Sequence, residues 1–190
     1  MVEKRRDLSD AKALRAMAHP VRWKLLEIVK REGTATATQC AKEIGESVAS
    51  CSYHLNMLAK YDFVEQAEGG QGREKPWRAV YLQQGWSDVG MEPDTELAAE
   101  AASQAFYEYE FELAKQRLAA SSMESDEWRE ALGSHSTNDW LTAQELVEVR
   151  EAMEAVLIPF HERRVNQAAR PAGARAVHLF LTYSVAPPRD

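Results

Sequence analysis

Residues 36–60 read TATQCAKEIGESVASCSYHLNMLAK and predict two short helices joined by a tight turn. Thr36 and Gln39 have the spacing of a capping box, which satisfies free backbone groups at the start of a helix. Gly45 suits the left-handed turn that ends this first helix, and Ser47 can cap the second. We therefore expect a helix, a glycine turn and a second helix.

The second helix of this pair has one apolar side and one polar side. Residues at spacings of three and four form an apolar stripe that we expect to be buried, namely Val48, Cys51, Leu55 and Leu58. The opposite side carries small or hydrogen-bonding residues: Ala49, Ser50, Ser52, Tyr53, Asn56 and Lys60. A helix that enters the DNA major groove needs slim side chains for close approach, with donors and acceptors for base edges and phosphates. The pattern therefore favours a DNA-recognition helix.

A glycine-rich hairpin is expected after the second helix. Residues 63–67 and 77–82 have the composition of two strands, and residues 69–72 form the expected tip between them. Arg73 and Lys75 follow the tip, where basic side chains can reach the DNA backbone. These elements together predict a winged helix-turn-helix domain. A small helical bundle with no DNA role is the alternative, because polar helix faces are common.

Two more helices are expected before this pair, over residues 9–18 and 21–31. His19 and Pro20 separate them, because the residue before a proline is disfavoured in a helix and proline suits a first helical turn. Gly33 is expected to end the second of them.

The C-terminal half is expected to be helical and to end in one strand. A long helix is predicted over residues 95–118. A capping box begins another helix at Thr142, and Pro159 is expected to kink or end it. Apolar residues alternate over residues 177–185, which predicts a strand that must join another sheet because a lone strand is unstable. The helix from Thr142 carries a narrow apolar seam suited to packing on another helix: Leu146, Val149, Met153, Val156 and Phe160.

The two halves of the chain differ in charge. Residues 1–90 carry 14 Lys and Arg against 12 Asp and Glu, whereas residues 91–190 carry 9 against 18. Phosphate binding depends on local positive charge, so the first half is the part expected to bind DNA. We predict a DNA-binding domain over residues 1–88 and a helical region for dimerisation or effector binding over residues 89–190.

The expected location is the cytoplasm. The N-terminus has no apolar run behind its basic residues, and no later segment is long and apolar enough to cross a membrane. The two cysteines form no disulfide framework and indicate a reducing compartment.

Several segments in a fixed order resemble the ArsR-type transcriptional regulators. They are residues 14–22 (LRAMAHPVR), the pair Leu25-Leu26, the turn motif with Ser52-Tyr-His-Leu55, and the glycine-rich wing. The C-terminal half is similar to the extra region of longer, actinobacterial-type members. The resemblance implies a mainly α winged helix-turn-helix protein with a small β-wing and a helical C-terminal extension. It also implies a homodimeric repressor that binds an inverted repeat in double-stranded DNA and is released by an effector.

Carried over from that family, the DNA-reading positions are Ser47, Ala49, Ser50, Ser52, Tyr53 and Asn56, with Arg73 and Lys75 from the wing. Asn56 could read adenine, and the hydroxyl groups could reach phosphates. The chain departs from the family pattern at Glu46, where members carry an apolar residue. Glu46 removes a core contact and puts a negative charge near the DNA.

Cys40 and Cys51 could suggest a metal sensor, but a closed site needs three or four converging ligands. The paired-cysteine motif of metal-sensing members is absent, and both cysteines occupy positions where an apolar residue would face the core. We expect no metal site, no cofactor and no catalytic residue, because the enzyme motifs that cradle phosphate, activate a serine or bind catalytic zinc are absent.

Aromatic residues in the C-terminal half have two interpretations. They form either a dimer seam or the wall of a small-molecule effector pocket. The residues are Phe106, Tyr107, Tyr109, Phe111, Trp128 and Trp140. The sequence thus favours a sequence-specific DNA-binding regulator, and the alternative is an interaction module whose C-terminal helices bind a partner protein while DNA binding is secondary.

Overall fold

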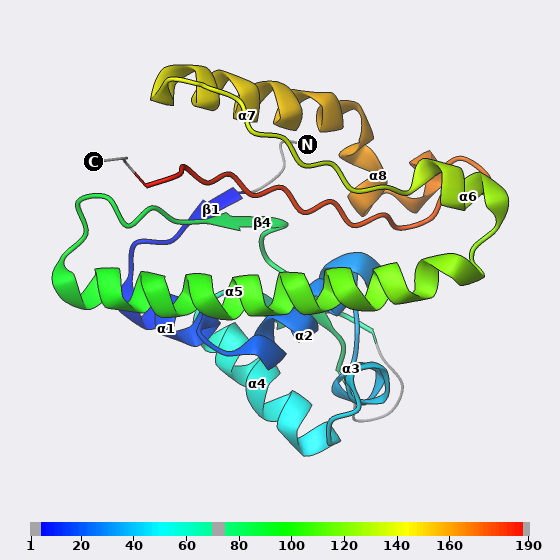
Figure 1. Cartoon of the computed structure of the whole chain (residues 1–190). Helices are drawn as coiled ribbons and strands as arrows, with labels where there is room; N and C mark the ends of the chain where they lie inside the picture. The colour runs from blue at the N-terminus through cyan, green and yellow to red at the C-terminus, as the bar shows by residue number, and fades with distance from the viewer. Residues whose placement is uncertain (1–4, 70–74, 188–190) are drawn as a thin grey trace.

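The computed structural model describes residues 5–69 and 75–187, and in these residues the protein is mainly helical with two small two-stranded sheets (Figure 1). The expected fold class, a mainly α winged helix-turn-helix protein with a helical C-terminal extension, is confirmed. The long helix α5 crosses the molecule, with α1, α3 and α4 on one side and β1, β4 and α7 on the other. In chain order the elements are β1 (Arg5–Asp7), α1 (Ala11–Met17), α2 (Pro20–Glu32), α3 (Ala37–Ile44), α4 (Val48–Lys60), β2 (Val64–Gln66), β3 (Trp77–Ala79), β4 (Gln83–Gly85), α5 (Pro93–Ala120), η1 (Ser121–Met123), α6 (Asp126–Ala131), α7 (Ala143–Leu157), η2 (Ile158–Phe160), α8 (Glu162–Val165) and η3 (Gln167–Ala169).

The turn between α3 and α4 is built by the residues that the sequence indicated. The Gln39 N–H donates to Thr36 Oγ1 at 3.2 Å and the Thr36 N–H donates to Gln39 Oε1 at 2.8 Å, which completes the capping box. Gly45 has a left-handed φ of 76°, and Ser47 Oγ accepts from the Ser50 N–H at 3.1 Å. Because side chains three residues apart make these contacts, local sequence alone predicts them.

The buried side of α4 differs from expectation at its first residue. Cys51, Leu55 and Leu58 have no exposed surface, as predicted, but Val48 is 45% exposed. Val48 is the first residue of α4, directly after the Ser47 cap, and this end of the helix projects beyond the core. The prediction that Val48 is buried is therefore wrong. The buried side of α4 instead includes His54, which was not part of the predicted apolar stripe.

The wing is an antiparallel pair of strands, with Val64 opposite Ala79. Ala35 and Trp77 exchange two backbone hydrogen bonds of 2.9 and 2.8 Å, which attach the wing to the chain before α3. The return strand ends at Ala79 instead of Leu82, because the chain then turns to form β4. β4 pairs in parallel with β1, which the sequence did not indicate. The expected wing tip lies largely outside the described residues.

Helix α5 shares one core with the N-terminal helices. Its alanines at positions 98, 99, 102 and 105 are buried, and it packs against α1 and α2. Small side chains on this face allow α5 to approach α1 closely. The buried cluster is therefore continuous from Leu8 in the N-terminal half to Tyr109 in α5.

Helix α7 begins at its predicted capping box and gives way to η2 around Pro159. The predicted terminal strand is not confirmed. Residues 176–187 are extended, but within the described part of one chain they pair with no strand. A strand is defined by hydrogen bonds to a neighbour, and apolar alternation cannot show whether one chain supplies that neighbour.

Candidate nucleic-acid interface

Helix α4 presents the expected polar face to solvent, at the side of the molecule away from α7 (Figure 1). Ser47, Ala49 and Asn56 are exposed, and Tyr53 keeps 59% of its surface exposed. The two other predicted positions, Ser50 and Ser52, are half-buried. The ring and hydroxyl group of Tyr53 are therefore accessible to a bound macromolecule.

Two of these side chains are already hydrogen-bonded within the helix. Ser47 Oγ accepts from the Ser50 N–H, so its own O–H is the group that can donate outward. Asn56 Nδ2 donates to the Ser52 carbonyl oxygen at 2.8 Å. One Nδ2 hydrogen and the Oδ1 acceptor stay available, and adenine recognition requires that pair of groups.

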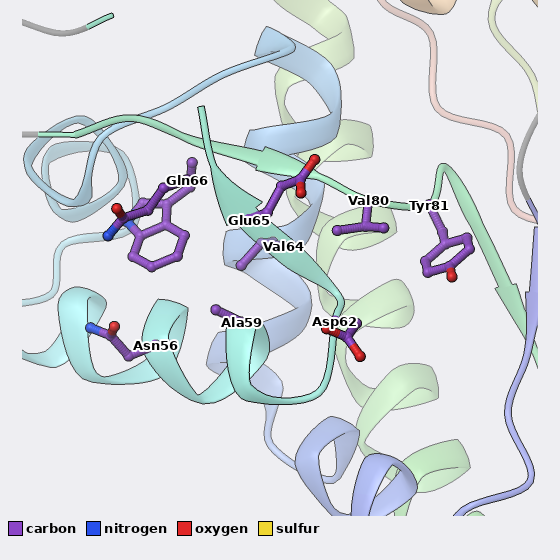
Figure 2. A pocket seen from close by; sticks show the side chains of 9 residues that line it. Asn56, Ala59, Asp62, Val64, Glu65, Gln66, Val80 and Tyr81 are labelled. Carbon is purple, nitrogen blue, oxygen red and sulfur yellow. The ribbon is translucent and has the colours of Figure 1, made fainter. Parts of the chain in front are cut away.

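A groove of about 610 Å³ lies between α4 and the wing (Figure 2). Asn56 and Gln66 lie at one end of it, and Asp62 and Tyr81 lie at the other. Its lining residues are Asn56, Ala59, Asp62, Val64, Glu65, Gln66, Trp77, Val80 and Tyr81. The two amides make one end suited to base edges, whereas Asp62 leaves the other end acidic.

Gln66 is a candidate reading residue that sequence reasoning missed. It is exposed in β2 and lies across the groove from Asn56. The available signal was its position in the first wing strand. Residues two apart in a strand lie on the same face, so Gln66 lies on the same face of β2 as Val64. Lys75 is exposed before β3, whereas Arg73 lies outside the described residues.

Beneath the polar face, four side chains join α4 to the junction of α1 and α2. The imidazole centroids of His19 and His54 lie 4.5 Å apart, and the ring of Tyr53 meets that of His54 edge-on at 5.2 Å. Arg22 Nε donates to His54 Nδ1 at 3.4 Å, and Arg22 Nη1 donates to the Ala16 carbonyl at 2.6 Å. His19 also caps α2, since its Nδ1 accepts from the Val21 N–H at 3.3 Å.

The surroundings of these histidines disfavour their charged forms. Burial lowers the pKa of His19 and of His54 below the usual 6.5, and the positive charge of Arg22 lowers both further. His19 adds to the lowering at His54, and Glu46 opposes it at both rings. Glu46, which departs from the family pattern, therefore partly offsets this lowering of the pKa of both histidines. It also lies just before the Ser47 cap of α4.

Acidification is expected to destabilise the junction of α1, α2 and α4. A histidine whose folded pKa lies below its unfolded value binds protons more readily when unfolded, so stability is full above about pH 6.5 and falls as the pH drops towards the folded pKa. We expect the melting temperature to fall from about pH 7.5 to about pH 5.5, with a smaller fall in His54→Gln, whose amide oxygen can still accept from Arg22. Thermal denaturation followed by circular dichroism measures the melting temperature. An equal fall in the parent protein and in His54→Gln would rule out His54 as a source of the pH dependence.

The cysteines lie in the core. Cys40 and Cys51 are free and have no exposed surface. Burial raises the pKa of Cys40 to about 11 and also raises that of Cys51. Within the described ranges no three His, Cys, Asp or Glu side chains are arranged to hold a metal ion. Both thiols are therefore protonated at neutral pH, and thiolate is the form that binds soft metals.

The predicted aromatic set separates into different environments. Phe106, Tyr107 and Phe111 surround Phe180 of the terminal segment, with ring centroids 6.0, 6.2 and 5.8 Å from it. Tyr109 faces the opposite way, into the core. Sequence reasoning missed Phe180 because it lies between the alternating apolar residues, which occupy odd positions.

The two tryptophans of the set lie apart from this cluster. Trp128 carries the guanidinium of Arg175 over its ring at 4.9 Å, and Trp140 is 97% exposed. The cluster instead gains two tryptophans from elsewhere, since Phe106 lies 4.9 Å from Trp23 and 6.4 Å from Trp86. The aromatic cluster therefore contains Phe180, Trp23 and Trp86. It does not contain Tyr109, Trp128 or Trp140, which the predicted set included.

Comparison with known protein families gives one match that bears on this interface. Residues 17–67 match the family model described as a helix-turn-helix domain, so the matched segment runs from the end of α1 through α4 and the first wing strand. The comparison with curated proteins finds no match. None of the described helices combines the length and apolar character needed to span a membrane.

Proposed function

We propose that this helix-turn-helix protein is a sequence-specific DNA-binding transcriptional regulator of the ArsR type, a cytoplasmic homodimer that represses transcription until an effector binds. The observation that carries the proposal is the outer face of α4, where small residues surround an exposed Tyr53 and Asn56. Residues 1–88 would supply the DNA-binding surface and residues 89–190 the contacts for dimerisation and effector binding, with α5 of the second part completing the core of the first.

The way in which α4 would dock in the DNA major groove follows from the sizes of its exposed side chains. Ser47, Ala49 and Ser50 allow the start of α4 to approach the major groove, and Tyr53 and Asn56 then reach base edges. Ser52 would contribute its hydroxyl to a phosphate, and Lys75 with Arg73 would hold the DNA backbone from the wing.

Dimerisation is required for adequate specificity. One recognition helix reads only a few base pairs, whereas a two-fold dimer places two helices about one DNA turn apart. Each operator half-site would then be an inverted copy of the other.

Ion pairs provide a route from the C-terminal half to the turn motif. Arg117 of α5 lies 3.7 Å from Glu27 of α2, and Glu27 lies 3.1 Å from Arg31. Arg31 in turn lies 2.6 Å from Glu43 of α3. An effector that moves α5, for example by binding beside the rings of Phe106, Tyr107 and Phe111, would shift the two recognition helices and so reduce affinity without touching a base contact.

A second candidate function is a protein-interaction module. The observation that favours it is the predicted seam of α7 and η2, which stays exposed in one chain at Val149, Met153, Val156 and Phe160. Exposed apolar rows of this kind mark interaction sites in soluble proteins.

Selection of bound sequences from a random pool of double-stranded DNA tests the proposal. The purified full-length protein is expected to enrich an inverted repeat with half-sites about one helical turn apart, at a stated salt concentration. Weak, salt-sensitive binding without enrichment, both alone and with candidate effectors, would instead favour the interaction module.

A further inference from the structure

The terminal segment, residues 176–187, is attached to α5 through alternate side chains. His178 Nε2 lies 2.6 Å from Oε2 of the buried Glu110. Thr182 Oγ1 donates to the Tyr107 hydroxyl at 3.5 Å, and Phe180 lies among the rings described above. The even-numbered residues therefore hold the segment on α5.

The odd-numbered residues of the same segment form an apolar row that one chain leaves exposed. They are Val177, Leu179, Leu181, Tyr183 and Val185. Successive side chains of an extended chain point to opposite faces, so anchoring of the even residues turns this row outward. The predicted alternation is present, but the apolar row is the outer one.

The backbone of the terminal segment also lacks a strand neighbour within residues 5–69 and 75–187. Residues 176–187 are assigned to no strand, and neither of the two sheets includes them. Residues 176–185 contain no Pro, Gly, Lys or Arg. Natural proteins protect exposed strand edges with such residues, and an unprotected apolar edge recruits another strand.

We propose that residues 177–185 pair antiparallel with the same segment of a second copy, about a two-fold axis at Leu181. This register pairs the whole outward row, because it sets Leu181 opposite Leu181, Leu179 opposite Tyr183, and Val177 opposite Val185. The inference rests on the proposed function, whose dimer it gives a specific interface.

Charge selects a second copy as the partner. A two-fold contact brings identical residues close together, so an interface of this kind must avoid like charges. Residues 91–190 carry twice as many acidic as basic side chains, yet residues 176–187 carry no Asp, Glu, Lys or Arg. The segment is thus a part of the acidic half that can meet its own copy without repulsion between like charges.

The pairing would also set the distance between the recognition helices. Each terminal segment is bound to α5, and α5 packs on α1 and α2, next to the turn motif. A ligand that separates Phe180 from the rings of α5 would therefore change the DNA-binding spacing.

Disulfide trapping in the full-length protein tests the interface. Directly opposite residues of an antiparallel pair have Cα atoms about 4.5–5.5 Å apart, which a disulfide can span. Leu181→Cys is expected to give a covalent dimer on mild oxidation, and so is a mixture of Leu179→Cys with Tyr183→Cys. The native cysteines are buried and do not interfere.

Met123→Cys is the matched control, since Met123 is exposed but lies outside the segment. Cross-linking of Leu181→Cys no faster than that of Met123→Cys would overturn the proposal, whatever the protein does with DNA. Leu181→Arg, which places two positive charges opposite each other, is expected to be monomeric in sedimentation. If the Leu181→Arg variant stays dimeric, the proposed interface is wrong even when DNA binding persists. If Leu181→Cys forms the covalent dimer but the protein binds no DNA, only the proposed function is refuted.

Discussion

Binding to the selected operator is expected to weaken roughly 30-fold or more when Tyr53 and Asn56 are both replaced by alanine. Base contacts contribute about 1–3 kcal/mol each, and 1.4 kcal/mol corresponds to a factor of ten in affinity. Asn56 can offer both the donor and the acceptor that adenine recognition requires, although its amide also donates to the Ser52 carbonyl. Fluorescence anisotropy with operator and scrambled duplexes at the same salt concentration measures the loss, which should be confined to the operator.

The double replacement should leave the fold intact. Both side chains are exposed, and the ring of Tyr53 lies in a T-shaped arrangement with that of the buried His54. The matched control is Asn138→Ala with Trp140→Ala, an exposed amide and an exposed aromatic residue in the acidic half. It should bind the operator as the parent protein does. Equal affinity of the Tyr53 and Asn56 variant and the parent would mean that α4 does not read the bases.

A fragment ending at residue 90 is expected not to fold cooperatively, whereas one ending at residue 123 should fold. The shorter fragment lacks α5, which covers α1 and α2 and contributes Tyr109 and four alanines to the shared core. It also lacks the ion pair between Arg15 and Asp94. The net stability of a domain is only about 5–15 kcal/mol. The free-energy cost of removing one packed layer of the core is therefore expected to exceed the whole net stability.

Urea denaturation of the two fragments, followed by circular dichroism, distinguishes these outcomes. The longer fragment should unfold in one sharp transition, and the shorter should show little structure at any urea concentration. A sharp transition for the shorter fragment would instead support the boundary at residue 88 that the sequence predicted. The longer fragment also lacks the terminal segment, so it should be monomeric if that segment forms the dimer.

The turn motif could be predicted from sequence because its determinants are local. The box at Thr36 and Gln39, the left-handed Gly45 and the cap at Ser47 each act within three or four residues, and all occur as expected. The polar face of α4 follows from helical periodicity, which fixed most of the candidate DNA-reading residues without knowledge of the packing.

Features that depend on contacts between distant residues could not be predicted in the same way. Val48 fits the apolar stripe of α4 by spacing, but only the position of the core shows that this end of the helix projects past it. The parallel pairing of β1 with β4 joins residues far apart in the chain, and no local signal encodes it. Gln66 became a candidate only when the groove placed it opposite Asn56.

The sequence by itself determined the two helices of the turn motif, their caps and the turn, because backbone hydrogen bonds and short-range capping are satisfied within a few residues. It also determined that residues 177–185 alternate. The tertiary structure decided which side of each element is buried: α5 turns its alanines to the core, and the terminal segment turns Phe180 to α5 and its apolar row to solvent. Periodicity defines two faces of an element, but burial depends on which face finds a complementary surface elsewhere in the chain.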